Sequence, residues 1–208
     1  AVAKSVFRSH NLPVSMDRIV SSNADLGSVI AQIEENFGSQ VAIKPLSAGS
    51  ALGVQLLPTG GDLYAALCDS LQFGDCLVEP FIAGKEITVG VLHTPQKLQA
   101  HPVIEIRTAA DQWYDYENRY TPGQSEHIVP ADLAPSVTAE LQHIAVTAHV
   151  ALGLRDLSRA DFILDKDNNI TLLEVNTLPG MTPTSLYPDG AAALGLERLH
   201  QHSNPVMR

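Results

Sequence analysis

Cysteine and basic charge are both scarce in this 208-residue chain. The two cysteines, Cys68 and Cys76, form neither a disulfide framework nor the ligand spacing of a zinc site, and such sparse usage is typical of a reducing cytoplasm. Lysine and arginine number 13 against 23 aspartate and glutamate residues, so the formal net charge is −10. This balance excludes a broadly basic surface for nucleic acid or anionic lipid, and an anionic ligand would need a local basic pocket.

Long apolar runs are also missing. No run approaches the roughly 18 residues of a membrane-spanning helix, and the opening residues AVAKSVFRSHNLPVS lack the apolar core of a signal peptide. We therefore expect no membrane association. A helix-like pattern begins directly at Ala1, which we interpret as a processed start or as a piece of a longer protein.

Hydrophobic residues make up 45% of the chain, enough to form the core of one substantial domain or two small, closely joined ones. Periodicity and turn residues predict helices and strands in both halves, hence an α+β fold. The expected helices span 3–10, 24–37 (capped by Ser22 or Asn23), 63–71 and 135–152, and the expected strands span 40–45, 54–57, 76–82, 86–92, 101–106, 159–165 and 170–176. Residues 109–135 show no steady periodicity, and we expect Trp113, Tyr114 and Tyr116 to pack this loop onto the body.

The last two expected strands form a hairpin that gathers acidic side chains. A two-residue turn at Asp167-Asn168 places Asp161 opposite Glu174, whereas a turn at Asn168-Asn169 places it opposite Asn176. In either register the oxygen atoms of these three side chains converge on one face, where opposed carboxylates need a cation between them. Such a donor set favours Mg²⁺. For the hairpin alone, acids that are merely hydrated at a solvent-facing edge explain the pattern equally well.

A second feature is Lys44, which lies in an apolar strand and is followed by the Gly/Ser-rich loop LSAGSALGV. A lysine there loses hydration unless it meets an anion, and the glycines let backbone N–H groups approach phosphate oxygens. This order differs from that of a Walker A motif. Taken alone, Lys44 is more commonly explained as a strand-end lysine that reaches solvent. Glu79 and Glu86 are likewise more commonly explained as acids that face solvent.

Several motifs together resemble one family. Lys44 with PLSAGS, LVEPFIAGKEITVGVL, WYDYENRY, RADFILD and LLEVNTLPGMTPTSLYP occur in the order found in the ATP-grasp ligases, and among them in the D-alanine-D-alanine ligases. The likeness runs from about residue 1 to about residue 194. It implies an ATP-grasp fold with ATP between the sheets of two α+β subdomains, here 1–85 and 86–208, and nothing in the chain looks like the family's preceding N-terminal domain.

The resemblance also implies roles for individual residues in binding ATP and metal. Lys44 and Arg119 match groups at the ATP phosphates, although Arg119 stands where the family usually has lysine, and the family's loop residues are replaced by Ala48 and Ala51. The remaining matches are the adenine hinge, the ribose-binding acid and the magnesium ligands: Glu79, Phe81 and Ile82; Glu86; and Asp161, Glu174 and Asn176.

Further matches concern the reacting groups. Arg159 and the backbone N–H of Gly180 match the groups that stabilise the oxyanion of the tetrahedral intermediate. Ser50 and Tyr120 match the pair that orients the amino-acid substrates. Ser185 and Leu186 match the loop that receives the carboxylate of the second D-alanine. Tyrosine at position 120, where ligases that make D-alanine-D-lactate carry histidine, favours the dipeptide product.

The implied function is an ATP-dependent ligase that joins two D-alanine molecules through a D-alanyl phosphate for peptidoglycan precursors. The implied cofactor is Mg²⁺, with Mn²⁺ as a substitute, and the implied setting is a cytoplasmic homodimer. The alternative hypothesis is an ATP-binding module, either an inactive fragment or a degenerate homologue that lacks the N-terminal substrate domain.

Overall fold

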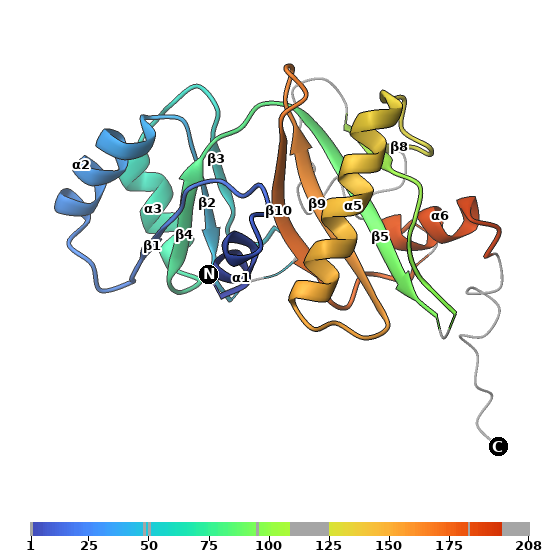
Figure 1. Ribbon diagram of the computed structural model, residues 1–208. Coiled ribbons are helices and arrows are strands. Elements are labelled where there is room, and N and C mark those ends of the chain that lie inside the picture. The colour runs from blue at the N-terminus through green and yellow to red at the C-terminus, as the bar shows by residue number, and fades with distance from the viewer. Residues whose placement is uncertain are drawn as a thin grey trace. The chain divides into compact units, whose positions relative to one another are not determined.

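The computed structural model describes residues 2–47, 49, 51–94, 96–108, 125–182 and 184–196. The chain divides into two compact units, one formed by Ala1–Val2 with Ser15–Ala83 and the other by Ala3–Val14 with Gly84–Arg208 (Figure 1). The second unit thus takes in most of the first helix. The mixture of helices and antiparallel sheets confirms the α+β class.

The first unit is a four-stranded antiparallel sheet in the order β1-β4-β2-β3 with two helices. Residues from both helices join residues from three of the strands in one apolar cluster, which includes Ile33, Leu67 and Val78. The elements are β1 (Arg18–Val20), α2 (Leu26–Phe37), β2 (Val41–Pro45), β3 (Gln55–Leu57), α3 (Leu63–Leu71) and β4 (Cys76–Pro80).

The helices of this unit are close to the predicted ones, with one correction at a cap. Asp25, not Ser22 or Asn23, precedes α2 in extended conformation, so the helix begins at Leu26. Asp62 caps α3 because its carboxylate accepts the Ala65 N–H at 3.0 Å. Gly38, at φ +75°, ends α2 as a residue free to adopt the left-handed region.

The second unit is a sheet in the order β10-β9-β5-β7-β8, with β6 paired to β5. All of its neighbouring strands are antiparallel. The elements are α1 (Val2–Ser9), β5 (Lys85–His93), β6 (Leu98–Ala100), β7 (Ile104–Thr108), β8 (Ser125–Ile128), α5 (Pro135–Ala151), β9 (Leu157–Leu164), β10 (Ile170–Asn176) and α6 (Leu186–Ala193). The strand expected at 101–106 begins three residues later, and the sequence did not predict β6, β8 or α6.

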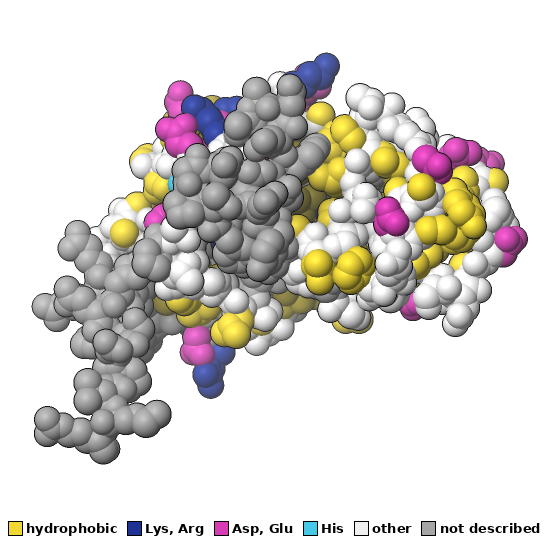
Figure 2. All heavy atoms as spheres, turned by 180° about the vertical axis from the view of Figure 1, so that it is seen from behind, with side chains coloured by type: hydrophobic (Ala, Val, Ile, Leu, Met, Phe, Trp, Pro, Cys, Tyr) yellow, Lys and Arg dark blue, Asp and Glu magenta, His cyan; other side chains and the backbone are white. Residues whose placement is uncertain are grey.

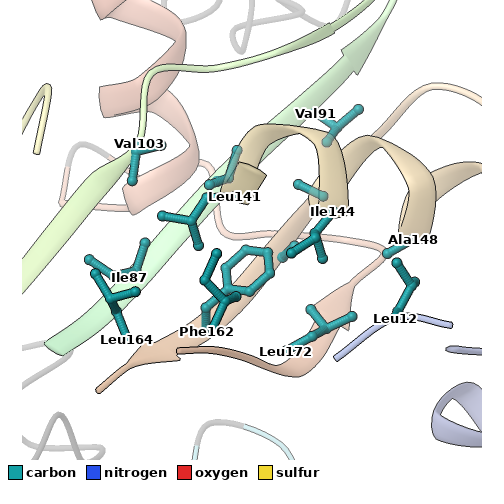
Figure 3. Packing of buried hydrophobic residues seen from close by; sticks show 14 of the residues in the cluster. Leu12, Ile87, Val91, Val103, Leu141, Ile144, Ala148, Phe162, Leu164 and Leu172 are labelled. Atoms are coloured by element: carbon teal, nitrogen blue, oxygen red, sulfur yellow. The ribbon is translucent and has the colours of Figure 1, made fainter. Parts of the chain in front are cut away.

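Helix α5 covers one face of this sheet and forms the larger core. Figure 3 shows Leu141 and Ile144 of α5 pointing toward Phe162 of β9, among side chains from β5 and β10. The helix ends where predicted, because Gly153 adopts φ +66° just beyond it.

The opposite face of the sheet is partly covered by α6. Leu186 packs with Ile104 and Ile106 in a small apolar cluster, and the Tyr187 hydroxyl donates to the Val91 carbonyl at 3.1 Å. Burial raises the pKa of Tyr187 to about 12, so its phenol keeps the donated proton. Thr88 of β5 and Asp161 of β9 lie on this face as well.

The surface is acidic, as the composition requires. On the face shown in Figure 2, Asp and Glu side chains lie at several separate places, in keeping with the formal net charge of −10. None of the helices in the described ranges is both long and apolar enough to cross a membrane.

Candidate functional site

The hairpin of β9 and β10 contains a register shift. Next to the loop, Leu164 pairs with Ile170 and Phe162 with Leu172, but beyond Leu172 the pairing moves by one residue and places Asp161 opposite Glu174. Of the two pairings that the sequence left open, that of Asp161 with Glu174 is confirmed, whereas the predicted two-residue turn is wrong. The loop between the paired residues spans 165–169, and the Asp165 carboxylate closes it by accepting the N–H groups of Asp167 and Asn169 at 2.8 Å each.

The shift at Leu173 determines which side chains reach the free face of the sheet. Side chains alternate along a strand, so without an extra residue Glu174 would share the core face with Leu172. A bulge adds that residue and turns Glu174 to the face of Asp161, while Val175 turns to the core. Asn176, paired with Arg159, joins the same face. The fold thus assembles all four predicted residues on the side away from α5.

Asp161 is the most heavily bonded residue of this face. Arg159 donates to it twice, from Nε to Oδ1 at 2.8 Å and from Nη2 to Oδ2 at 2.7 Å. The Thr88 hydroxyl donates to Oδ1 at 2.6 Å, and the Asn176 amide donates to Oδ2 at 2.9 Å. Charge-assisted bonds of this kind are short and hold the carboxylate in one orientation.

The side chains of Asp161, Glu174 and Asn176 fit a divalent cation that prefers oxygen ligands. The Asn176 amide nitrogen lies 2.9 Å from Asp161 Oδ2 and 3.4 Å from Glu174 Oε1, so a donor already stands between the two carboxylates. Turning that amide over would offer its oxygen as a third ligand. Within the described ranges, no three His, Cys, Asp or Glu side chains group to hold a metal ion, and here the third ligand is an amide.

In the first unit, Lys44 and Glu79 form an ion pair. Lys44 Nζ lies 2.7 Å from Glu79 Oε2, and the Ser15 hydroxyl donates to Glu79 Oε1 at 2.7 Å. The Glu79 side chain is 3% exposed and that of Lys44 29%. The explanation of both residues as ordinary solvent-facing charges is therefore wrong for Glu79, which is buried and holds the lysine ammonium in place.

The segment after β4 carries the other residues predicted to bind adenosine. The Phe81 N–H donates to the Gln40 carbonyl at 2.9 Å, which fixes the backbone at the end of the sheet. Among the described residues, neither the amide nor the carbonyl of Ile82 has a hydrogen-bond partner. Glu86, in β5, is partly exposed and shares the face of Thr88 by strand alternation.

The loop between β10 and α6 brings Gly180 against Ser185. A methyl group at Gly180 would lie 2.7 Å from Ser185 Oγ, which accepts the Thr182 N–H at 3.1 Å. Ser185 precedes α6 without a side-chain hydrogen bond to cap it, and Leu186, the first helical residue, is buried. The first N–H groups of α6 are thus not capped by Ser185, and a helix N-terminus attracts anions.

Some predicted residues lie outside the described residues. These are Ser50, Arg119 and Tyr120, together with Ala48 and the aromatic residues Trp113, Tyr114 and Tyr116. Near Ser50 the described part of the glycine loop is tightly built: Ala51 adopts φ +59°, and a methyl group on Gly53 would lie 2.4 Å from the Phe73 ring.

The contacts that the sequence did not predict include Thr88 to Asp161, Ser15 to Glu79, and His127 of β8 to Asp189 of α6, with Nδ1 to Oδ2 at 2.7 Å. Alternation along the expected strand EITVGVL predicts which face of the sheet Thr88 occupies, so this part of its contact could be found from the sequence. The partners of the other two depend on long-range packing that a sequence pattern does not carry.

Comparisons with known proteins agree with this geometry. A family model described as "D-ala D-ala ligase C-terminus" matches residues 7–200. A D-alanine-D-alanine ligase of Oleidesulfovibrio alaskensis is 41% identical over 197 residues, which are 94% of this chain and 61% of the relative. A second one, from Halalkalibacterium halodurans, is 46% identical over 158 residues, 75% of this chain and 52% of the relative.

Solved structures show the same fold. The VanG D-Ala:D-Ser ligase of Enterococcus faecalis superposes with a TM-score of 0.79 at 28% identity, covering 93% of this chain and 56% of that one. The D-alanine-D-alanine ligase of Coxiella burnetii superposes with a TM-score of 0.77 at 25% identity, covering 94% and 51%. The chain therefore spans about half to three fifths of the length of these proteins.

Proposed function

The chain belongs to the D-alanine-D-alanine ligase family, matching its C-terminal part, and from this we propose that the protein containing it is an ATP-dependent ligase that joins two D-alanine molecules for peptidoglycan precursor synthesis. The observation that carries the proposal is the polar face of the second unit, where the bulge at Leu173 brings Glu174 and Asn176 to Asp161 and Arg159. We further propose a cytoplasmic homodimer.

The proposed reaction has two steps. The carboxylate of the first D-alanine attacks the γ-phosphorus of ATP, the bond from that phosphorus to the β,γ-bridging oxygen breaks, and ADP leaves. The amine of the second D-alanine then attacks the carbonyl carbon of the D-alanyl phosphate, loses a proton, and expels phosphate. Both steps bring several negative charges together, so cationic groups must be concentrated locally in a protein of net charge −10.

Residues of both units are proposed to bind ATP. Lys44 contacts the phosphates, and its ion pair with the buried Glu79 supports this by fixing the ammonium group. The hinge of Glu79, Phe81 and Ile82 holds the adenine, which is supported by the backbone groups of Ile82, unpaired among the described residues. Glu86 binds the ribose hydroxyls, and Arg119, outside the described residues, completes the phosphate contacts.

Asp161, Glu174 and Asn176 are proposed to hold Mg²⁺ or Mn²⁺, which when bound would neutralise phosphate charge. This rests on the opposed carboxylates and on the amide donor that stands between them. Arg159, whose guanidinium now pairs with Asp161, is proposed to stabilise the oxyanion of the tetrahedral intermediate together with the Gly180 N–H.

Residues that hold the substrates come from the two loops. Ser185 and Leu186 are proposed to receive the carboxylate of the second D-alanine, supported by the α6 N-terminus, whose N–H groups Ser185 leaves uncapped. Ser50 and Tyr120 are proposed to orient the amino acids, and both lie outside the described residues.

Phosphate release from ATP tests the proposal in the full-length protein that contains this chain. We expect release that depends on D-alanine and on a divalent ion, with L-alanine as the matched negative substrate. Release that is independent of D-alanine, or no release with D-alanine, would contradict it.

The second candidate function is an ATP-binding module without ligase activity, favoured by the chain's coverage of only 52% and 61% of two curated relatives. Calorimetry with ATP and Mg²⁺ on the 208-residue chain, beside the phosphate assay on the same chain, separates the two functions. Binding without turnover in both the chain and the full-length protein would favour the module.

A further inference from the structure

Thr88 lies at the centre of the second unit's sheet and is completely buried, with 0% of its surface exposed. The register of β5 and β9 places it directly opposite Asp161. Its neighbours Ile87 and Val89 belong to the core under α5, so strand alternation turns Thr88 to the polar face.

The hydroxyl of Thr88 has two acceptors within reach. Its Oγ1 lies 2.6 Å from Asp161 Oδ1 and 3.2 Å from the Ala160 carbonyl oxygen. A hydroxyl donates a single proton, and the short contact to an ionised carboxylate is the stronger one. A buried hydroxyl is unfavourable unless it is bonded, so this bond explains why threonine rather than valine occupies the position.

Unlike Arg159 and Asn176, Thr88 keeps its hydrogen bond to Asp161 in the proposed reaction. The four contacts of Thr88, Arg159 and Asn176 occupy both carboxylate oxygens. In the proposed function Arg159 turns to the reacting carbonyl and Asn176 turns its amide oxygen to the metal, so their donated bonds are given up. The Thr88 hydroxyl is enclosed, so its bond to Asp161 Oδ1 stays in place.

We propose that Thr88 is a positioning residue that holds the Asp161 carboxylate in the orientation in which it ligates the divalent cation. The inference rests on the proposed function for the identity of the ligand. It predicts that loss of the hydroxyl weakens metal binding while the fold is kept, since valine has the same shape as threonine.

Binding of Mn²⁺, followed by the electron paramagnetic resonance of the free ion in the presence of ATP, tests this on the 208-residue chain. We expect Thr88→Val to weaken Mn²⁺ binding about 10- to 100-fold, as is usual when a partner of a metal ligand is removed. Thr88→Ser, which keeps the hydroxyl, should bind close to the wild type. The matched control is Thr171→Val in β10, whose hydroxyl makes no hydrogen bond to Asp161.

Thermal unfolding in EDTA checks that each variant folds, and Thr88→Ala serves with the same expectation if Thr88→Val does not fold. The inference is overturned if Thr88→Val binds Mn²⁺ like the wild type, if Thr88→Ser is equally weak, or if Thr171→Val loses as much. A wild type that binds no Mn²⁺ contradicts the metal assignment and this role with it. Intact Mn²⁺ binding that depends on Thr88, without D-alanine-dependent turnover, contradicts only the ligase reaction.

Discussion

His101 is the residue whose surroundings are least favourable to charge. It is 0% exposed, it packs against Gly90 and Gly190, and its ring centroid lies 4.6 Å from that of Tyr187. Neither ring nitrogen has a hydrogen-bond partner in the part of the chain that the structure describes. Burial therefore lowers the pKa of His101 from 6.5 to about 4, and the folded protein holds this imidazole neutral.

This lowered pKa predicts a loss of stability in acid. The unfolded chain takes up a proton at His101 near pH 6.5 and the folded protein only near pH 4, so stability is fully present above pH 6.5 and falls as the pH approaches 4. The full pKa shift corresponds to a loss of about 3 kcal/mol in the free energy of unfolding.

Urea unfolding at pH 7 and at pH 4.5 measures this loss of stability. We expect His101→Leu to lose less stability over this interval than the wild type by about 2 kcal/mol. The exposed His143→Leu should behave like the wild type, and equal pH dependence in all three proteins would refute the assignment.

At the scale of elements, α6 can approach β5 only because a glycine from each of them, Gly190 and Gly90, lies against His101. A methyl group on Gly190 of α6 would lie 2.8 Å from His101 Nδ1 and 3.1 Å from its Cβ, and the buried ring has no room to move. Helix α6 begins next to Ser185, so its seating on the sheet also places the loop proposed to receive the second carboxylate.

Gly190→Ala should therefore destabilise the protein by about 1 to 3 kcal/mol through overpacking. Gly27→Ala is the matched control, because Gly27 lies in α2 with its nearest neighbouring atom at 3.7 Å, and it should stabilise by about 0.5 kcal/mol through helix propensity. Thermal unfolding compares them. A Gly190→Ala variant as stable as Gly27→Ala would show that His101 does not limit the approach of α6.

Sequence patterns predicted most elements because alternation and helical spacing are local. The hairpin of β9 and β10 shows the limit of local patterns. The sequence LLEVN has the pattern of a regular strand, but Leu173 is an additional residue in it, and only the pairing with β9 reveals the bulge. The pairing of Asp161 with Glu174 was one of the two that the sequence left open. The five-residue loop was missed because the Asp165 side chain, rather than a two-residue turn, organises residues 165–169.

At the scale of the whole molecule, an acidic protein must present cations where phosphate is proposed to bind. Two of the proposed cations lie among the described residues, and each is paired with a carboxylate: Lys44 with Glu79 in the first unit, and Arg159 with Asp161 in the second. These pairs keep the cations oriented, and incoming phosphate must compete with the carboxylates for them. The family, the fold class and these four residues were all predictable from motifs. The pairing of Lys44 with Glu79 depends on the register of β2 and β4, whereas Arg159 and Asp161 lie two residues apart on β9.

The formation of D-alanyl-D-alanine from ATP and D-alanine, detected by chromatography, directly measures the proposed ligase reaction. The full-length protein that contains this chain would be compared with its Asp161→Asn variant and with Thr171→Val. We expect dipeptide from the wild type and from Thr171→Val, and a loss of at least about 100-fold in Asp161→Asn, because it removes a metal ligand from the polar face. Dipeptide formed by Asp161→Asn at the wild-type rate would contradict the account.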